Sequence, residues 1–237
     1  MLMLLNDSIT YPESDGRPMA DNTEQFRWIV YLKENLEWLF AADPAVFVAG
    51  DLLWYPIEGK DKLCQAPDVL VAFGRAKGRR GSYRQWLEGN IPPQVVIEVI
   101  SPGNTIPEMT RKFQFYERYG VEEYYLYDPD RGSLDGFIRQ DEGLVPLETV
   151  EGWVSPRLGI HFLLTGGGEL QILRPDGQPF ESFQVLAERA EQERQRAEQE
   201  RQRAEQERQR AEQERQRAER LAERLRQLGI DPDSPGE

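Results

Sequence analysis

The sequence predicts a mixed α/β domain with a central sheet flanked by helices, followed by a long charged helix. Short apolar segments typical of strands recur along the first 185 residues, and two segments have the 3.6-residue apolar spacing of helices. All five Trp, ten Phe and nine Tyr lie there as well, which is enough apolar material for one core. We therefore expect a globular domain over 1–185, a charged heptad-repeat helix or coiled coil over 186–228, and a disordered tail over 229–237.

The first expected element is a helix that begins after Asp21 or Asn22 and runs to about Ala42. Either residue can cap a helix N-terminus with its side-chain oxygen. The apolar positions that follow have a period near 3.6, at Phe26, Ile29, Val30, Leu32, Leu36 and Leu39.

Strands are expected next, at 46–55 with a bend at Gly50, and at 67–73. A glycine-rich basic connection spans 74–93. The strand at 94–100 is apolar on both faces, which is typical of a strand in the interior of a sheet.

A second helix is expected between Pro107, a favoured first residue, and Gly120, a favoured stop. It follows a turn at 101–105 and precedes a strand at 121–127. Further short strands are expected at 134–139, 144–150, 158–164 and 169–174.

The charged segment repeats Ala-Glu-Gln-Glu-Arg-Gln-Arg from Ala190, Ala197, Ala204 and Ala211. One apolar position per heptad is fewer than the two that a strong coiled coil needs. A single solvated helix supported by Glu–Arg pairs is one interpretation. The alternative is a homodimer, formed through the domain or through the C-terminal helix, where Ala218, Leu221, Leu225 and Leu228 have heptad-like spacing.

Composition limits the compartment and the partners. The formal net charge is −13, yet residues 187–228 hold twelve Arg against eleven Glu, so the acidic excess lies mainly in the domain. Such a domain disfavours nonspecific, high-affinity nucleic-acid binding but leaves room for a local basic groove. A single cysteine, Cys64, the lack of a signal-peptide pattern at the start and the lack of a membrane-length apolar run point to the cytoplasm.

Three charged residues stand where the local pattern favours apolar ones. Asp68 opens an apolar strand, Glu98 interrupts another, and Lys112 lies within the apolar stripe of the second helix. Each has an ordinary structural explanation: a strand-end cap, a structural ion pair and a lysine that reaches solvent. Neighbouring strands and the following helix can nevertheless bring the three to one sheet edge.

Together these residues permit a metal-dependent phosphodiester-cleaving site. Asp68 and Glu98 would hold Mg²⁺ or Mn²⁺ through oxygen ligands, and the main-chain carbonyl of Val99 or Ile100 would add another. Lys112 would orient the attacking water or stabilise developing negative charge.

Five segments in order resemble one bacterial family, the putative restriction endonuclease family of the PD-(D/E)xK nuclease superfamily. They are Pro67-Asp68, Ile97-Glu-Val-Ile-Ser-Pro-Gly103, Lys112-Phe-Gln-Phe-Tyr116, Gly120-Val-Glu-Glu-Tyr124 and Tyr127-Asp-Pro-Asp130. The resemblance implies a restriction-endonuclease-like fold, a divalent metal and cleavage of DNA. It assigns metal binding to Asp68 and Glu98 and the catalytic lysine to Lys112.

The wider superfamily differs at two points. Its usual lysine position, two residues after the glutamate, is Ile100 here, and this family places the lysine on the following helix. The superfamily often adds an acid from the first helix, for which Glu24 is the candidate, ahead of Glu34 or Glu37. Asp51 is the alternative fourth acid.

A basic segment offers candidate DNA contacts at Arg75, Lys77, Arg79, Arg80 and Arg84. The alternative is a solvated loop. For the whole chain, the competing function is a nonenzymatic DNA-binding or oligomerisation protein that retains a nuclease fold.

Overall fold

The computed structural model describes residues 9–14, 16, 18–164 and 169–228, so the predicted disordered tail at 229–237 lies outside the described residues. The chain divides into two compact units, with the boundary between Glu181 and Ser182. The first is a mixed α/β unit with a central six-stranded sheet flanked by helices, and the second contains one long helix. The predicted fold class is confirmed.

The central sheet has the strand order β1-β3-β5-β6-β7-β8. Only β5 and β6 pair in parallel, and all other neighbours are antiparallel. The parallel pair requires a crossover, which is the second helix of the chain. The strands are β1 (Val46–Gly50), β3 (Val69–Phe73), β5 (Val95–Val99), β6 (Glu123–Asp128), β7 (Ser133–Gln140) and β8 (Gly143–Pro146).

Two small sheets complete the unit, and they change two predictions. The expected strand at 46–55 is two strands, because the chain leaves β1 through Asp51, which has a φ of 48°. The expected connection at 74–93 contains a short strand and a 3-10 helix. The added elements are β2 (Trp54–Tyr55) paired with β4 (Tyr83–Arg84), η1 (Gln85–Glu88), and β9 (His161–Leu164) paired with β10 (Leu170–Leu173).

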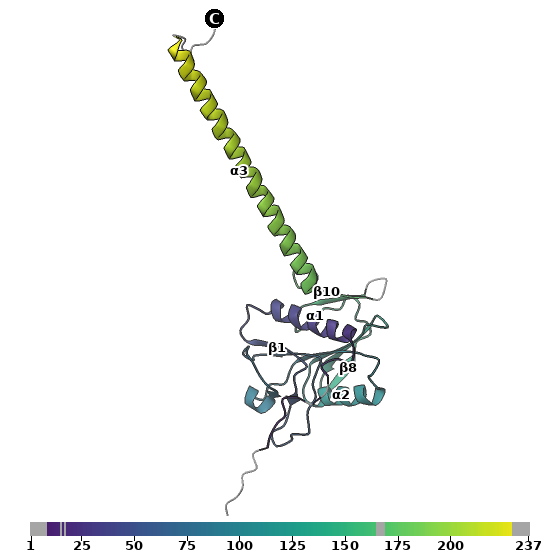
Figure 1. Ribbon diagram of the computed structural model, residues 1–237. Helices are drawn as coiled ribbons and strands as arrows, with labels where there is room; N and C mark the ends of the chain where they lie inside the picture. The colour runs from purple at the N-terminus through teal and green to yellow at the C-terminus, as the bar shows by residue number, and fades with distance from the viewer. Residues whose placement is uncertain (1–8, 15, 17, 165–168, 229–237) are drawn as a thin grey trace, which may run out of the picture. The chain divides into compact units, whose positions relative to one another are not determined.

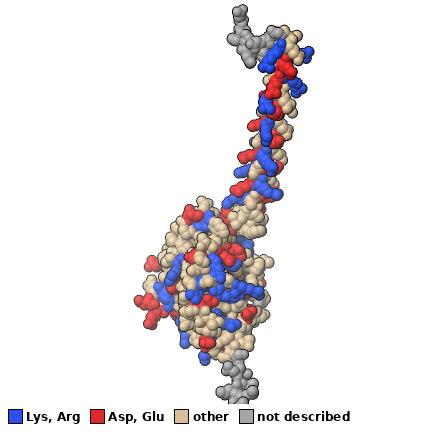
Figure 2. All heavy atoms as spheres, turned by 90° about the vertical axis from the view of Figure 1, so that its left-hand side faces the viewer, with Lys and Arg blue, Asp and Glu red and all other residues tan. Residues whose placement is uncertain are grey.

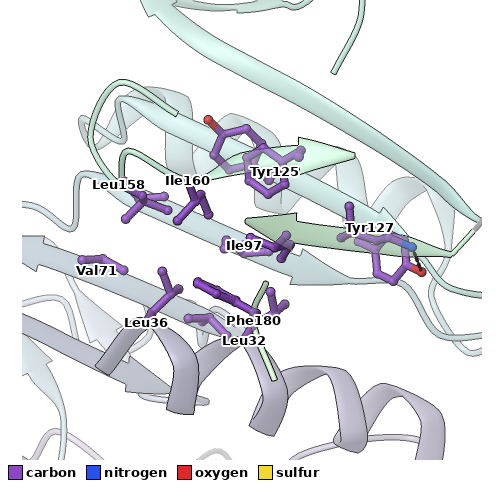
Figure 3. Packing of buried hydrophobic residues seen from close by; sticks show 14 of the residues in the cluster. Leu32, Leu36, Val71, Ile97, Tyr125, Tyr127, Leu158, Ile160 and Phe180 are labelled. Carbon is purple, nitrogen blue, oxygen red and sulfur yellow. Dashed lines mark hydrogen bonds between the residues drawn. The ribbon is translucent and has the colours of Figure 1, made fainter. Parts of the chain in front are cut away.

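Helix α1 (Thr23–Leu39) covers one face of the central sheet (Figure 1). Asn22 caps it by accepting a hydrogen bond from the Gln25 amide at 2.8 Å. Leu32 and Leu36 pack against the sheet together with residues of the segment that follows β8 (Figure 3). Phe26 and Val30, predicted to lie on the inward face, are 48% and 39% exposed. Trp28 is buried instead, beside Ile29, Leu32 and Leu36, which were predicted correctly.

Helix α2 (Ile106–Arg118) covers the opposite face of the sheet. Thr105 caps its N-terminus, and Gly120 follows its end with a φ of 94°, as the sequence predicts. Phe115 and Tyr116 are its buried residues and pack with Trp54 and Tyr124 in a second core cluster. The sheet therefore has a core on each face, which explains why its central strands are apolar on both sides.

A buried carboxylate ties the segment after β8 to the sheet. Glu123 is 2% exposed and accepts hydrogen bonds from the Tyr125 hydroxyl at 2.9 Å, the Arg157 amide at 2.6 Å and the Ser155 hydroxyl. Burial raises the pKa of Glu123, and the three hydrogen bonds offset that rise only in part. Each of the three donors therefore lowers the free-energy cost of burying the Glu123 carboxylate.

Ser155→Ala is expected to lower the free energy of unfolding by about 1–3 kcal/mol, because it removes a donor to a buried carboxylate. Urea denaturation measures the change. Ser14→Ala, at an exposed serine, is the control and should change stability little. Equal losses in the two variants would contradict a structural role for the Glu123 cluster.

The second unit consists of α3 (Phe183–Gln227), capped by Ser182. Acidic and basic side chains alternate along it (Figure 2), with Glu–Arg pairs such as Glu191–Arg194 and Glu212–Arg215. None of its described residues is buried in the single chain. Dimerisation stays a prediction that light scattering tests. Across the described part of the chain, no helix is both long enough and apolar enough to cross a membrane.

Candidate active site

Strand register brings the first two predicted site residues together. Val69 of β3 pairs with Ile97 of β5 in antiparallel register, so the next pair along the strands is Asp68 and Glu98. Side chains alternate between the faces of a strand, and Val96 packs in the core on the α2 side of the sheet. Glu98, two residues on, faces α2 as well.

Helix α2 supplies two groups to Glu98. The Lys112 ammonium donates to Oε2 of Glu98 at 2.8 Å, and the Tyr116 hydroxyl donates to Oε1. Lys112 and Tyr116 are four residues apart and therefore lie on the same side of the helix. Both carboxylate oxygens of Glu98 are thus oriented by α2, and its side chain is 2% exposed.

Asp68 is the second acid of the cluster. It is 7% exposed, and its Oδ2 accepts a hydrogen bond from the Val99 amide at 2.7 Å. Burial raises the pKa of Asp68 well above its ordinary value, and the charge of Glu98 raises it further, while Lys112 acts in the opposite direction. With both acids ionised, two buried carboxylates beside one ammonium would carry a surplus of negative charge, which either a proton on Asp68 or an added cation offsets.

Lys112 is held as a cation by this surplus. Burial alone would lower the pKa of Lys112, but the charges of Glu98 and Asp68 outweigh it, and the pKa lies above its ordinary value. The side chain is 15% exposed, so the ammonium is a fixed positive charge at the edge of the cluster.

The acid expected from the first helix is not at this cluster. Glu24 pairs with Arg27 at 2.6 Å and accepts from the Trp28 indole, and its side chain is 45% exposed. Its neighbour Gln25 is buried, and its amide donates to the Val99 carbonyl at 3.0 Å. One residue on a helix is a rotation of 100°, so the inward position is Gln25, and the structure shows no contact between Glu24 and the cluster.

The less favoured acids also differ in their placement. Glu34 and Glu37 are exposed and pair with Lys33. Asp51 lies next to the cluster through its main chain, because its amide donates to the carbonyls of Pro67 and Asp68 at 3.1 and 3.2 Å. Asp51 is therefore the better-placed of the additional acids.

The residues present fit a magnesium-like ion. Mg²⁺ in proteins is commonly held by one or two carboxylates and keeps several waters, so Asp68 and Glu98 are a sufficient donor set. The Val99 carbonyl already accepts from Gln25, although a carbonyl oxygen has a second lone pair. No group of three or more His, Cys, Asp or Glu side chains suited to a metal occurs among the described residues, which excludes a multi-acid cage there.

The basic segment is split between structural and exposed residues. Arg80 is 14% exposed, forms a bidentate pair with Glu88, and stacks over the Phe47 ring at 3.9 Å. Arg75 and Arg84 are half-buried, whereas Lys77 and Arg79 are exposed. Arg80 thus has a structural role in this loop, and its role in DNA contact stays a prediction. Figure 2 shows a band of basic side chains across one face of the first unit.

Substitutions should separate these two groups. Arg80→Ala is expected to lower the free energy of unfolding by about 2 kcal/mol, because Glu88 loses its partner and Phe47 its cation. Lys77→Ala and Arg79→Ala should leave stability within about 0.5 kcal/mol. Thermal unfolding measures the difference, and a stability loss in Lys77→Ala as large as that in Arg80→Ala would contradict it.

Two residues of the cluster were missed by the sequence interpretation. The sequence interpretation gave no role to Tyr116 or to Gln25. The spacing of Lys112 and Tyr116 was a usable signal, because two polar groups at i and i+4 can reach one carboxylate. Nothing in the sequence distinguishes Gln25 from Glu24 except the exact rotation of α1.

Comparisons with known proteins identify a family and a similar crystal structure. A family model described as putative restriction endonuclease (Uma2) matches residues 14–165, which is more than half of the 237-residue chain. The crystal structure of a putative nuclease belonging to DUF820 from Anabaena variabilis ATCC 29413 is similar, with a TM-score of 0.44 and 15% identity over 59% of this chain and 74% of that chain. No curated protein matches the chain.

Proposed function

Because the chain belongs to the putative restriction endonuclease family, we propose that it is a metal-dependent endodeoxyribonuclease. In this proposal Asp68 and Glu98 hold Mg²⁺ or Mn²⁺, and Lys112 acts on the reacting phosphate or water. The observation that carries the proposal is the register that sets Asp68 opposite Glu98, with the Lys112 ammonium 2.8 Å from the Glu98 carboxylate.

The protein groups have separable roles. Asp68 and Glu98 supply hard oxygen donors in a buried setting, where their mutual repulsion favours a divalent cation. Lys112, held positive by both acids, would stabilise negative charge that develops on the phosphate oxygens. Tyr116 and the Val99 amide orient the two carboxylates through the oxygens they bond.

A bound ion would lower the pKa of a coordinated water and would neutralise charge on the phosphate. The chain itself provides the alignment, because strands β3 and β5 and helix α2 fix Asp68, Glu98 and Lys112 on one face of the sheet. This reaction needs no covalent nucleophile from the protein.

Supercoiled plasmid DNA is the substrate that tests the proposal. With Mg²⁺ or Mn²⁺ present, the protein should convert it to relaxed or linear forms, and excess EDTA should stop the conversion. DNA that stays supercoiled at high protein concentration, while a gel shift shows binding, would favour the noncatalytic DNA-binding alternative instead.

A further inference from the structure

A cleft of about 700 Å³ opens on the α2 side of the sheet. One wall is the side of α2 that carries Ile106, Met109 and Phe113, and the other is formed by β6 and β7 with Tyr124 and Phe137. Its volume is in the range of pockets that bind small ligands. None of these residues has a role in the proposed cleavage site.

The cleft lies beside the carboxylate cluster. Phe113 directly follows Lys112 in α2, and Leu126 on the cleft wall is the register partner of Glu98 across β5 and β6. Paired strands are about 4.8 Å apart, so the cleft begins roughly one strand away from Glu98. One nucleotide is therefore long enough to place its base in the cleft and its phosphate at Lys112.

The walls of the cleft suit a flat aromatic ligand. Phe113 and Phe137 contact each other edge to face at 5.0 Å between centroids, and Tyr124 stacks on Phe137 at 5.6 Å. The rim carries Asp128 and Asp130 as well as Arg131. Two carboxylates at the rim disfavour a phosphate inside the cleft, whereas aromatic rings attract the face of a nucleobase.

Tyr124 contributes its aromatic ring to this apolar surface. It is 1% exposed, and among the described residues its hydroxyl has no hydrogen-bond partner. Burial raises the pKa of Tyr124 well above its ordinary value, and Glu98 and Asp68 raise it further, so the hydroxyl keeps its proton. The hydroxyl oxygen is buried, so the wall of the cleft is formed by the aromatic ring of Tyr124 and not by its hydroxyl.

We propose that this cleft binds one unpaired nucleobase of the DNA substrate next to the phosphate that is cleaved. The inference deepens the proposed function and rests on it for the identity of the substrate. A base within a duplex is stacked and paired and cannot enter a cleft of this kind, so single-stranded or locally unpaired DNA is the preferred substrate. Loss of one base from the strand should then weaken binding at one position only.

Fluorescence anisotropy with labelled oligodeoxynucleotides tests the cleft without cleavage. Ca²⁺ replaces Mg²⁺, and three probes are compared: a single strand, the same strand with one abasic site moved along it, and the matching duplex. The single strand should bind about tenfold more tightly than the duplex, and one abasic position should remove about tenfold in affinity, which is the size of one base–aromatic stack.

Variants of the cleft walls locate the effect. Phe113→Leu keeps apolar volume but loses the aromatic face, and it should bind intact and abasic strands alike. Trp38→Leu changes a 60% exposed aromatic residue on α1, across the sheet, and should retain the preference.

The outcomes separate this proposal from the nuclease proposal. Equal affinity for single strand and duplex, with no abasic effect, overturns the cleft as a base site, even if plasmid is cleaved. A base preference that depends on Phe113, in a protein that cleaves neither plasmid nor single-stranded DNA with Mg²⁺ or Mn²⁺, leaves the cleft standing and overturns the nuclease. Thermal unfolding of each variant shows that the protein remains folded in these comparisons.

Discussion

Glu98→Gln is expected to lower the rate of plasmid cleavage by about 100-fold or more. The change keeps the shape of the side chain but removes the negative charge that faces Lys112 and the proposed metal. Loss of a hydrogen-bonding partner one layer away from a metal ligand already costs about 10- to 100-fold, so loss of a ligand charge should reach or exceed that range. Initial rates of supercoil loss in Mg²⁺ measure the effect.

Three further variants show whether the loss of cleavage comes from the carboxylate cluster. Asp68→Asn should behave like Glu98→Gln, and Tyr116→Phe should cost about tenfold, because Glu98 keeps its charge but loses one orienting donor. Glu24→Gln, on the exposed side of α1, should cleave like the wild-type protein. Full cleavage by Glu98→Gln would show that the chemistry lies elsewhere.

Lys112→Met is expected to destabilise the metal-free protein by about 3 kcal/mol, because it leaves the Glu98 carboxylate buried without its cation. Met has a similar length and keeps the packing of the lysine stem. The double variant Lys112→Met with Glu98→Gln should regain much of this stability, with an interaction free energy of about 2 kcal/mol between the two sites. It should not regain cleavage.

Urea denaturation of the wild type, both single variants and the double variant completes this cycle. Lys33→Met is the control, because Lys33 forms its ion pairs on the surface, where such pairs contribute about 1 kcal/mol or less. If Lys112→Met cost no more than Lys33→Met, the Lys112–Glu98 pair would not be the buried interaction described above.

The sequence predicted the components of the site better than their pairing. Charges at Asp68 and Glu98 inside apolar strands are visible without a structure, because burial makes such residues anomalous. Which two strand residues stand opposite one another depends on register, and a slip of one residue reverses the face of every side chain. The antiparallel pairing of β3 with β5 settles this point.

Helix rotation explains the clearest errors. Lys112 was placed inward correctly because a charged residue within an apolar stripe limits the rotation of α2. In α1 the predicted stripe included Phe26 and Val30, which are exposed, and omitted Trp28, which is buried. The inward face is therefore centred nearer to Gln25 than the predicted stripe indicates, and Glu24, proposed from the family resemblance, lies 100° away from Gln25 around the helix.

Contacts with other strands explain the remaining differences between the predicted and observed structures. Arg80 looked like one member of a basic loop, yet its guanidinium binds Glu88 and covers Phe47 from another strand. The apolar run after Ala45 looked like one strand, yet it divides between two sheets. Both arrangements depend on partners distant in the sequence, which local patterns do not specify.

A crystal soaked with Mn²⁺ tests the central claim most directly, because anomalous scattering locates the ion without reference to activity. The account predicts an anomalous peak bonded to carboxylate oxygens of both Asp68 and Glu98, with Lys112 beside it, and loss of that peak in Glu98→Gln. A peak bound elsewhere, or none at these two carboxylates in a crystal of protein that cleaves DNA, would contradict it.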